Sequence, residues 1–126
     1  MTPRRVLVVD DEQNSREGLS KILTKEGYHV HTAEDGVKAL REAEAYDFDL
    51  IITDLRMPDM DGIEVLKKVR EKNKGIGVVI VTAYGEVNSY LTAMNLGAFE
   101  YLNKPIHLEE LRRVIKKALS ESLQEY

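Results

Sequence analysis

Six residues in this sequence carry groups that could act together in chemistry: Asp10, Asp11, Glu12, Asp54, Thr82 and Lys104. Carboxylates can act as nucleophiles or as ligands of a hard cation, and a hydroxyl or ammonium group can hold phosphoryl oxygens. Together these groups suit the transfer of a phosphoryl group onto an aspartate. Each residue also has an ordinary role open to it, as a helix cap, a strand end or a surface charge. The prediction therefore depends on whether the fold brings them together.

The segment around Asp54 predicts a buried strand that ends at this residue. Residues 50–52 are apolar without alternation, which is typical of a strand covered on both faces. Pro58 follows shortly, and proline cannot donate a hydrogen bond into a sheet. In open parallel sheets, ligands bind at the carboxyl ends of the strands. We therefore expect Asp54 at a ligand-binding edge.

Strand-like and helix-like segments alternate five times along the chain. The strand-like segments are 5–9, 28–33, 50–53, 78–82 and 98–102. In the fourth helix, Val87, Tyr90, Leu91 and Met94 form an apolar stripe on one face. This alternation predicts an α/β fold, a doubly wound parallel sheet with helices on both faces and right-handed crossovers.

The helix ends are also marked in the sequence. Asn14 or Ser15 could cap the first helix, and Asp35 could cap the second. Gly27 and Gly97 stand where the first and fourth helices are expected to end.

A parallel sheet would bring all six residues to one edge. The first strand delivers Asp10, Asp11 and Glu12 there, the third delivers Asp54, and Thr82 and Lys104 come from the fourth and after the fifth. Two carboxylates 4 Å apart repel by about 4 kcal/mol at an effective dielectric constant of 20. Lys104 offsets part of this repulsion, and a bound cation can offset the rest. Mg²⁺ sites in proteins typically combine a few carboxylates with water and phosphate oxygens. We therefore expect Mg²⁺ here, with Mn²⁺ as a substitute.

Composition excludes several other functions. The 126 residues fit one domain, and without cysteine there are no thiolate nucleophiles or thiolate metal sites. The net charge is −4, and residues of both signs are mixed along the chain, which argues against contact with nucleic acid. No apolar run has membrane-spanning length and no signal peptide is recognisable, so we expect a soluble, cytoplasmic protein without membrane contact. The glycine-rich phosphate loops and the G-x-S-x-G motif of hydrolases do not occur.

Four motifs resemble the receiver domain of two-component response regulators. They are Val9-Asp10-Asp11-Glu12, Asp54 with Met57-Pro58-x-Met60-Asp61-Gly62, Thr82-Ala83, and Lys104-Pro105. The resemblance covers essentially the whole chain and implies a flavodoxin-like (βα)5 sheet with strand order 2-1-3-4-5. We expect the receiver domain at 1–122 and a tail or the start of a linker at 123–126.

The resemblance also implies roles for individual residues. Asp54 would accept a phosphoryl group from a sensor histidine kinase, and the Mg²⁺ ligands would be Asp10, Asp11, Asp54 and the Arg56 backbone carbonyl. Glu12 would lie behind the ligands, and the Lys104–Pro105 bond would be cis. The domain would catalyse its own phosphorylation and dephosphorylation only, and would not be an enzyme otherwise.

Residues around the site would control access and signalling. Arg56 and Tyr84 flank it and would limit the access of water, with Ala83 and Pro105 beside them. On phosphorylation the Thr82 hydroxyl would turn toward the phosphoryl group, and Tyr101 would move inward. The responding face would comprise the fourth helix, fifth strand and fifth helix, as a regulated contact or a homodimer interface. Its exposed residues would be Asn88, Asn95, Arg112, Arg113 and Lys116.

Three alternatives remain open from the sequence. Residues 82–85 and 97–105 look like those of NtrC-type, sigma-54-dependent activators, so the chain would be the receiver of a longer transcription regulator or a stand-alone response regulator. An aspartate-nucleophile phosphatase would use similar groups, but it typically carries D-x-D where this chain has Asp10-Asp11. A degenerate receiver that is never phosphorylated fits poorly with the complete residue set.

Overall fold

The computed structural model describes residues 3–72, 75–83 and 85–123. Its elements follow in the order β1 (Arg5–Val9), α1 (Gln13–Lys25), β2 (His29–Ala33), α2 (Gly36–Ala45), β3 (Leu50–Asp54), α3 (Gly62–Lys72), β4 (Gly77–Thr82), α4 (Val87–Asn95), β5 (Glu100–Asn103) and α5 (Leu108–Leu123). The strands form one parallel sheet in the order β2-β1-β3-β4-β5, which confirms the predicted topology.

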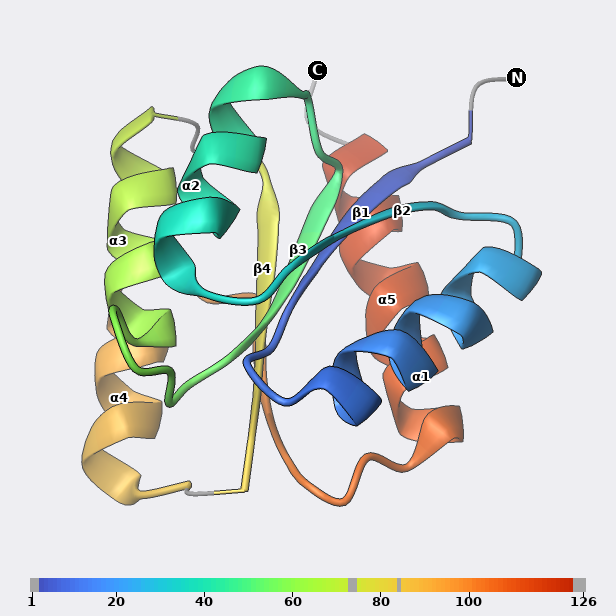
Figure 1. Cartoon of the computed structure of the whole chain (residues 1–126). Helices are drawn as coiled ribbons and strands as arrows, with labels where there is room; N and C mark the ends of the chain where they lie inside the picture. The colour runs from blue at the N-terminus through green and yellow to red at the C-terminus, as the bar shows by residue number, and fades with distance from the viewer. Residues whose placement is uncertain (1–2, 73–74, 84, 124–126) are drawn as a thin grey trace.

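Helices cover both faces of the sheet. In Figure 1, α2, α3 and α4 lie on one side of the strands and α1 and α5 on the other. Side chains that alternate along the strands divide the core accordingly. Leu7 and Ile51 belong to the cluster under α2, α3 and α4, whereas Val8 and Ile52 belong to the cluster under α1 and α5. The central strands are apolar without alternation because both of their faces are buried.

The helix starts depend on acidic side chains. Asp35 and Asp61 accept hydrogen bonds from backbone N–H groups in the first turns of α2 and α3. The expectation of Asn14 or Ser15 as the cap of α1 is wrong. Glu12 is the N-cap residue, and its Oε2 accepts a hydrogen bond from Ser15 N at 2.5 Å.

Glycines end two helices, as predicted. Gly27 has φ = 98° and Gly97 has φ = 93°, a region that other residues rarely enter. They follow α1 and α4 and allow the chain to turn back toward the sheet.

Helix α4 differs from the others because most of its apolar stripe faces solvent. A stripe of this kind normally packs against the core. Here Val87 is 74% exposed and Leu91 51%, and the helix is anchored to the sheet mainly through Ala93. Spacing identifies an apolar face but does not tell whether that face meets the sheet or the outside.

The last helix reaches the end of the described residues. Leu123, expected to begin the tail, is the last residue of α5, and residues 124–126 lie outside the described part. Among the described residues, no helix has the length and hydropathy that crossing a bilayer requires.

Candidate functional site

The strand register brings Asp10 and Asp54 together. Val9 pairs with Thr53 across β1 and β3, so the residue that follows each of them lies at the same edge of the sheet. On the other side of β3, Asp54 pairs with Val81, which places Thr82 one residue further along β4. The parallel register therefore creates the convergence expected from the sequence.

Lys104 binds both buried carboxylates. Its Nζ donates to Asp10 Oδ2 at 3.0 Å and to Asp54 Oδ2 at 2.9 Å. The remaining oxygens accept from backbone groups, Asp10 Oδ1 from Glu12 N at 3.0 Å and Asp54 Oδ1 from Arg56 N at 3.3 Å. Burial acts to lower the pKa of Lys104, but the hydrogen bonds and charges of Asp54 and Asp10 outweigh it and raise that pKa. The ammonium group is therefore held in its charged form.

Three carboxylates at this edge fit a divalent cation. Oxygens of Asp10, Asp11 and Asp54 lie within 4.8 Å of one another, a distance at which each pair repels by about 3 kcal/mol at an effective dielectric constant of 20. Asp10 and Asp54 are buried, whereas Asp11 is exposed toward the outside. One ammonium cannot neutralise three carboxylates. An all-oxygen donor set with an open side suits Mg²⁺, which keeps several water ligands.

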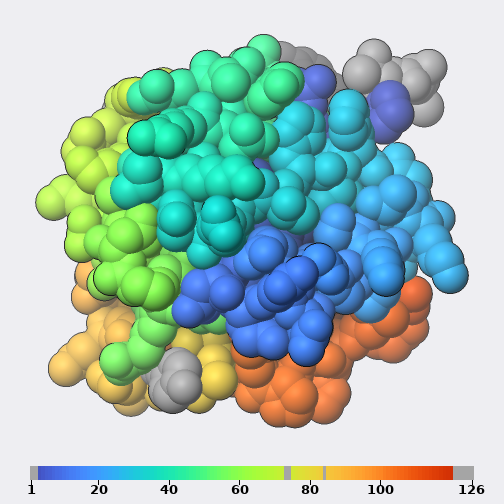
Figure 2. All heavy atoms as spheres, in the orientation of Figure 1, coloured from blue at the N-terminus to red at the C-terminus, as the bar shows by residue number. Residues whose placement is uncertain are grey.

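An open cleft of about 590 Å³ leads to Asp54. Its walls come from the start of α1, the β3–α3 loop and the chain beyond β4 and β5: Asp11, Glu12, Ser15, Asp54, Arg56, Met57, Pro58, Ala83 and Lys104. In the space-filling view, the blue surface of α1 lies beside the green surface of the β3–α3 loop (Figure 2). The cleft is thus wide enough for a phosphoryl donor to approach.

Residues expected beside the site occupy different positions. Hydrogen bonds from Ser15 lower the pKa of Glu12, which agrees with its capping role at the start of α1. Ala83 and Pro105 are exposed, and the Lys104–Pro105 bond is cis as expected. Tyr84 lies outside the described residues.

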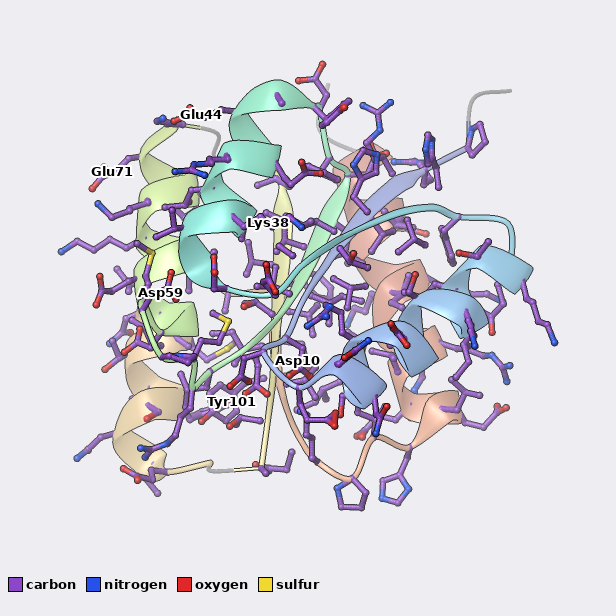
Figure 3. The ribbon with its side chains drawn as sticks, viewed as in Figure 1. Asp10, Lys38, Glu44, Asp59, Glu71 and Tyr101 are labelled. Atoms are coloured by element: carbon purple, nitrogen blue, oxygen red, sulfur yellow. The ribbon has the colours of Figure 1, made fainter. Side chains whose placement is uncertain are left out.

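Thr82 and Tyr101 are both buried. Thr82 has no exposed surface, and Tyr101 is 8% exposed at the lower edge of the sheet in Figure 3. The ring of Tyr101 meets the ring of Tyr90 on α4 edge to face, with centroids 5.6 Å apart. Among the described residues, none shares a hydrogen bond with the buried Tyr101 Oη. The tyrosine is therefore already turned inward, next to α4.

Four of the five residues expected to be exposed on α4 and α5 are exposed. Asn88, Asn95, Arg113 and Lys116 are exposed. Arg112 instead points toward α1, where its Nε donates to Glu26 Oε2 at 2.7 Å.

Two residues that sequence reasoning missed hold the surroundings of the site. Asp59, in the β3–α3 loop, accepts from the backbone N–H groups of Gly36 and Val37 at the start of α2 (Figure 3). Arg70, on α3, donates to the backbone oxygen of Gly97 at the end of α4, at 2.7 Å. No local pattern marks such contacts, because their partners are far away in the sequence.

Comparison with known proteins identifies the family. The profile described as the response regulator receiver domain matches residues 6–116. The chain belongs to this family. It is 40% identical over 115 residues to the regulatory protein AtoC of Escherichia coli, covering 91% of the chain but 25% of AtoC. It is 37% identical to sporulation initiation phosphotransferase F of Bacillus subtilis, covering 94% of the chain and 96% of that protein.

Solved structures of receivers agree with the fold. A receiver from Methanospirillum hungatei superposes with a TM-score of 0.96 at 32% identity, covering 99% of this chain and all of that one. TrrA of Thermotoga maritima, solved in complex with Mg²⁺ and beryllofluoride, gives 0.84 at 40% identity, covering 92% and 99%. The beryllofluoride-activated NtrC4 receiver dimer gives 0.88 at 37% identity, covering 94% and 98%. The chain is a receiver domain of the two-component systems, with transcription regulators among its relatives.

Proposed function

We propose that Asp54 is the phosphoacceptor of this receiver and takes a phosphoryl group from a sensor histidine kinase. One observation carries the proposal: a buried carboxylate at the end of the central strand is bound by an ammonium group and flanked by two further carboxylates. A structural cluster would bear the repulsion of these charges for no gain. A phosphoryl-transfer site uses them to bind a cation.

The residues have complementary roles in the proposed reaction. An Asp54 oxygen attacks phosphorus, the bond from phosphorus to the donor nitrogen breaks, and the imidazole of the kinase leaves with that electron pair. Lys104 stabilises the charge on the phosphoryl oxygens, and the Thr82 hydroxyl donates a hydrogen bond to one of them. Mg²⁺ held by Asp10, Asp11, Asp54 and the Arg56 backbone carbonyl would neutralise phosphoryl charge. Arg56, Tyr84, Ala83 and Pro105 would govern the access of water to the acyl phosphate.

The test is intact-mass measurement after incubation with Mg²⁺ and acetyl phosphate. The wild type should gain one phosphoryl group, and Asp54→Asn should gain none. Removal of the metal with EDTA should abolish the gain of the phosphoryl group, and Mn²⁺ should restore it. Ca²⁺ should support less phosphorylation than Mg²⁺, because it tolerates looser coordination geometry. A stable phosphoryl group on Asp54→Asn would show that another residue is the acceptor.

We further propose that Thr82 and Tyr101 pass the signal to α4, β5 and α5. Tyr101 is already buried, so we propose that phosphorylation changes the contact between its ring and the ring of Tyr90, in place of the inward movement expected from the sequence. Side-chain NMR shifts with and without Mg²⁺ and beryllofluoride, in wild type and Thr82→Ala, would test this. Equal responses of Tyr101 in both proteins would exclude the route through Thr82.

We propose two alternatives for the output. The chain spans about a quarter of the length of AtoC, which favours a receiver within a longer transcription regulator. It spans nearly all of sporulation initiation phosphotransferase F, which favours a stand-alone regulator. The cytoplasmic location remains a prediction, which cell fractionation would test.

A further inference from the structure

The side chain of Arg56 links the phosphoacceptor loop to α4. Its backbone N–H donates to Asp54 Oδ1, while its Nη2 donates to Glu86 Oε1 at 3.0 Å. Glu86 is the N-cap residue of α4, yet its side chain makes no capping hydrogen bond to that helix. The carboxylate that could stabilise the first turn of α4 is instead directed to Arg56.

The same arginine also lines the cleft that leads to Asp54. Both side chains of the Arg56–Glu86 pair are more than half exposed, at 55% and 61%. Exposed pairs are weak and change an equilibrium constant by a factor of about 1.4 to 5. A phosphoryl group on Asp54 would add about −1.5 to −2 charges and three acceptor oxygens to the cleft that Arg56 also lines. Guanidinium matches phosphate oxygens in shape and charge, so Glu86 would lose the competition.

We propose that Arg56 exchanges Glu86 for the phosphoryl group on Asp54 and thereby releases the start of α4. This inference rests on the proposed function of Asp54 and adds a positioning residue and a route of regulation to it. The freed Glu86 carboxylate can then cap α4, because acidic side chains are favoured at helix N-termini. The release acts on the helix that carries the exposed residues Val87 and Leu91.

A double-mutant cycle in beryllofluoride binding tests the exchange. The dissociation constant of beryllofluoride in saturating Mg²⁺ would be measured by ¹⁹F NMR for wild type, Arg56→Gln, Glu86→Gln and the double variant. Glu86→Gln should tighten binding about 1.4- to 5-fold, and Arg56→Gln should weaken it. The decrease in the dissociation constant caused by Glu86→Gln should be smaller in the Arg56→Gln background than in the wild-type background. If the Glu86 charge acted directly on beryllofluoride and not through Arg56, the decrease would be equal in both backgrounds.

Glu44→Gln is the matched control, because Glu44 pairs with Lys72 in an exposed ion pair far from the cleft. It should leave the dissociation constant unchanged. A second readout needs no ligand: amide shifts of Val87 and Asn88 in free Glu86→Gln should move toward their beryllofluoride-bound positions. Equal gains in both backgrounds, or no gain in the wild-type background, would overturn the exchange while leaving Asp54 as acceptor. Failure of the wild type to bind beryllofluoride would overturn the proposed function and the exchange together.

Discussion

The carboxylates of Asp10 and Asp54 share the ammonium group of Lys104, and each has its other oxygen on a backbone N–H. Buried charges persist in proteins when they are paired and hydrogen-bonded in this way. The arrangement explains why acidic residues can remain buried at the end of an apolar sheet. In the proposed function Lys104 has a second task, to stabilise the charge of the incoming phosphoryl group.

Lys104→Ala should slow phosphorylation more than it weakens cation binding. Loss of one charged donor to the reacting oxygens should lower the rate about 100-fold or more. Mg²⁺ affinity should be equal to or greater than that of the wild type, because three carboxylates remain without a competing cation. Intact mass over time with acetyl phosphate, and calorimetric titration with Mg²⁺, would measure the two effects. A rate within twofold of the wild type would contradict the assigned role.

Gly62 allows the close approach of α3 to the backbone of Asp54. A Cβ atom at Gly62 would lie 2.4 Å from the Asp54 backbone oxygen, so Gly62→Ala should destabilise the fold by about 1–3 kcal/mol. Gly18, in α1, is the control because a Cβ there would meet nothing within 4 Å. Gly18→Ala should stabilise the fold by about 0.5–1 kcal/mol through helix propensity. Urea unfolding would measure both, and equal effects of the same sign would contradict the steric explanation.

The identity of the site was largely predictable from the sequence, whereas the contacts around it were not. Asp54 ends a strand and Asp10 and Lys104 directly follow strands, so a parallel sheet had to bring them to one edge. The sequence left a capping role open to Glu12 but favoured Asn14 or Ser15, because asparagine and serine are the commoner capping residues. The Arg56–Glu86 pair joins residues 30 positions apart, and no local pattern specifies such a partner.

At the level of the elements, loops fasten the helices to one another. Asp59 ties the β3–α3 loop to the start of α2, and Arg70 ties α3 to the end of α4. The start of α4 depends on the exposed Arg56–Glu86 pair. The C-terminal end of α4 is thus bound by a hydrogen bond from Arg70, and its N-terminal end takes part in an exposed ion pair with Arg56. The exposed stripe of α4 was not predictable because amphipathic spacing is the same for a core face and a contact face.

The Asp59 contact predicts a dependence of stability on pH. Burial acts to raise the pKa of Asp59, but hydrogen bonds from Val37 and Gly36 outweigh it and lower that pKa. The folded value is thus below the unfolded value of about 3.9, so the contribution is complete above that pH and is lost as pH falls through the folded value. Asp59→Asn should cost less than about 1 kcal/mol at neutral pH, because water screens this exposed carboxylate.

The difference in unfolding free energy between wild type and Asp59→Asn should therefore shrink on acidification below about pH 4. Thermal or urea unfolding from pH 7 to pH 3 would measure it. Asp47→Asn is a suitable control, since among the described residues none donates a hydrogen bond to the Asp47 carboxylate. A difference that grows in acid would show that the sign is wrong.

Across the whole molecule, the strongest exposure of large apolar side chains is on α4. The exposed large apolar residues among those described are Val37, Tyr46, Val87, Tyr90 and Leu91. Three of these five, Val87, Tyr90 and Leu91, lie on α4, and Tyr90 contacts Tyr101 on the proposed signalling face. Grouped exposure of this kind marks a contact surface. The NtrC4 receiver, which is 37% identical to this chain, is a dimer in its beryllofluoride-activated form.

Leu91→Glu should weaken self-association in Mg²⁺ and beryllofluoride by about tenfold or more, because burial of a leucine contributes about 1.5–3 kcal/mol. Val37→Glu is the matched control, since Val37 is 41% exposed on α2, which lies apart from α4 on the far side of α3 (Figure 1). Sedimentation velocity over a range of concentrations would measure the association. Equal weakening by both substitutions would show that the contact does not depend on α4.

The ion pairs of Lys104 join residues 94 and 50 positions apart, to Asp10 and Asp54. A chain leaving the ribosome therefore exposes its two acids before the lysine that neutralises them exists. At about 5–20 residues per second, the interval between synthesis of Asp54 and Lys104 is about 3–10 seconds. The two carboxylates are thus neutralised only late in the synthesis of the chain. A growing chain that ends before β5 contains Asp10 and Asp54 but lacks the ammonium group of Lys104 that pairs with both of them.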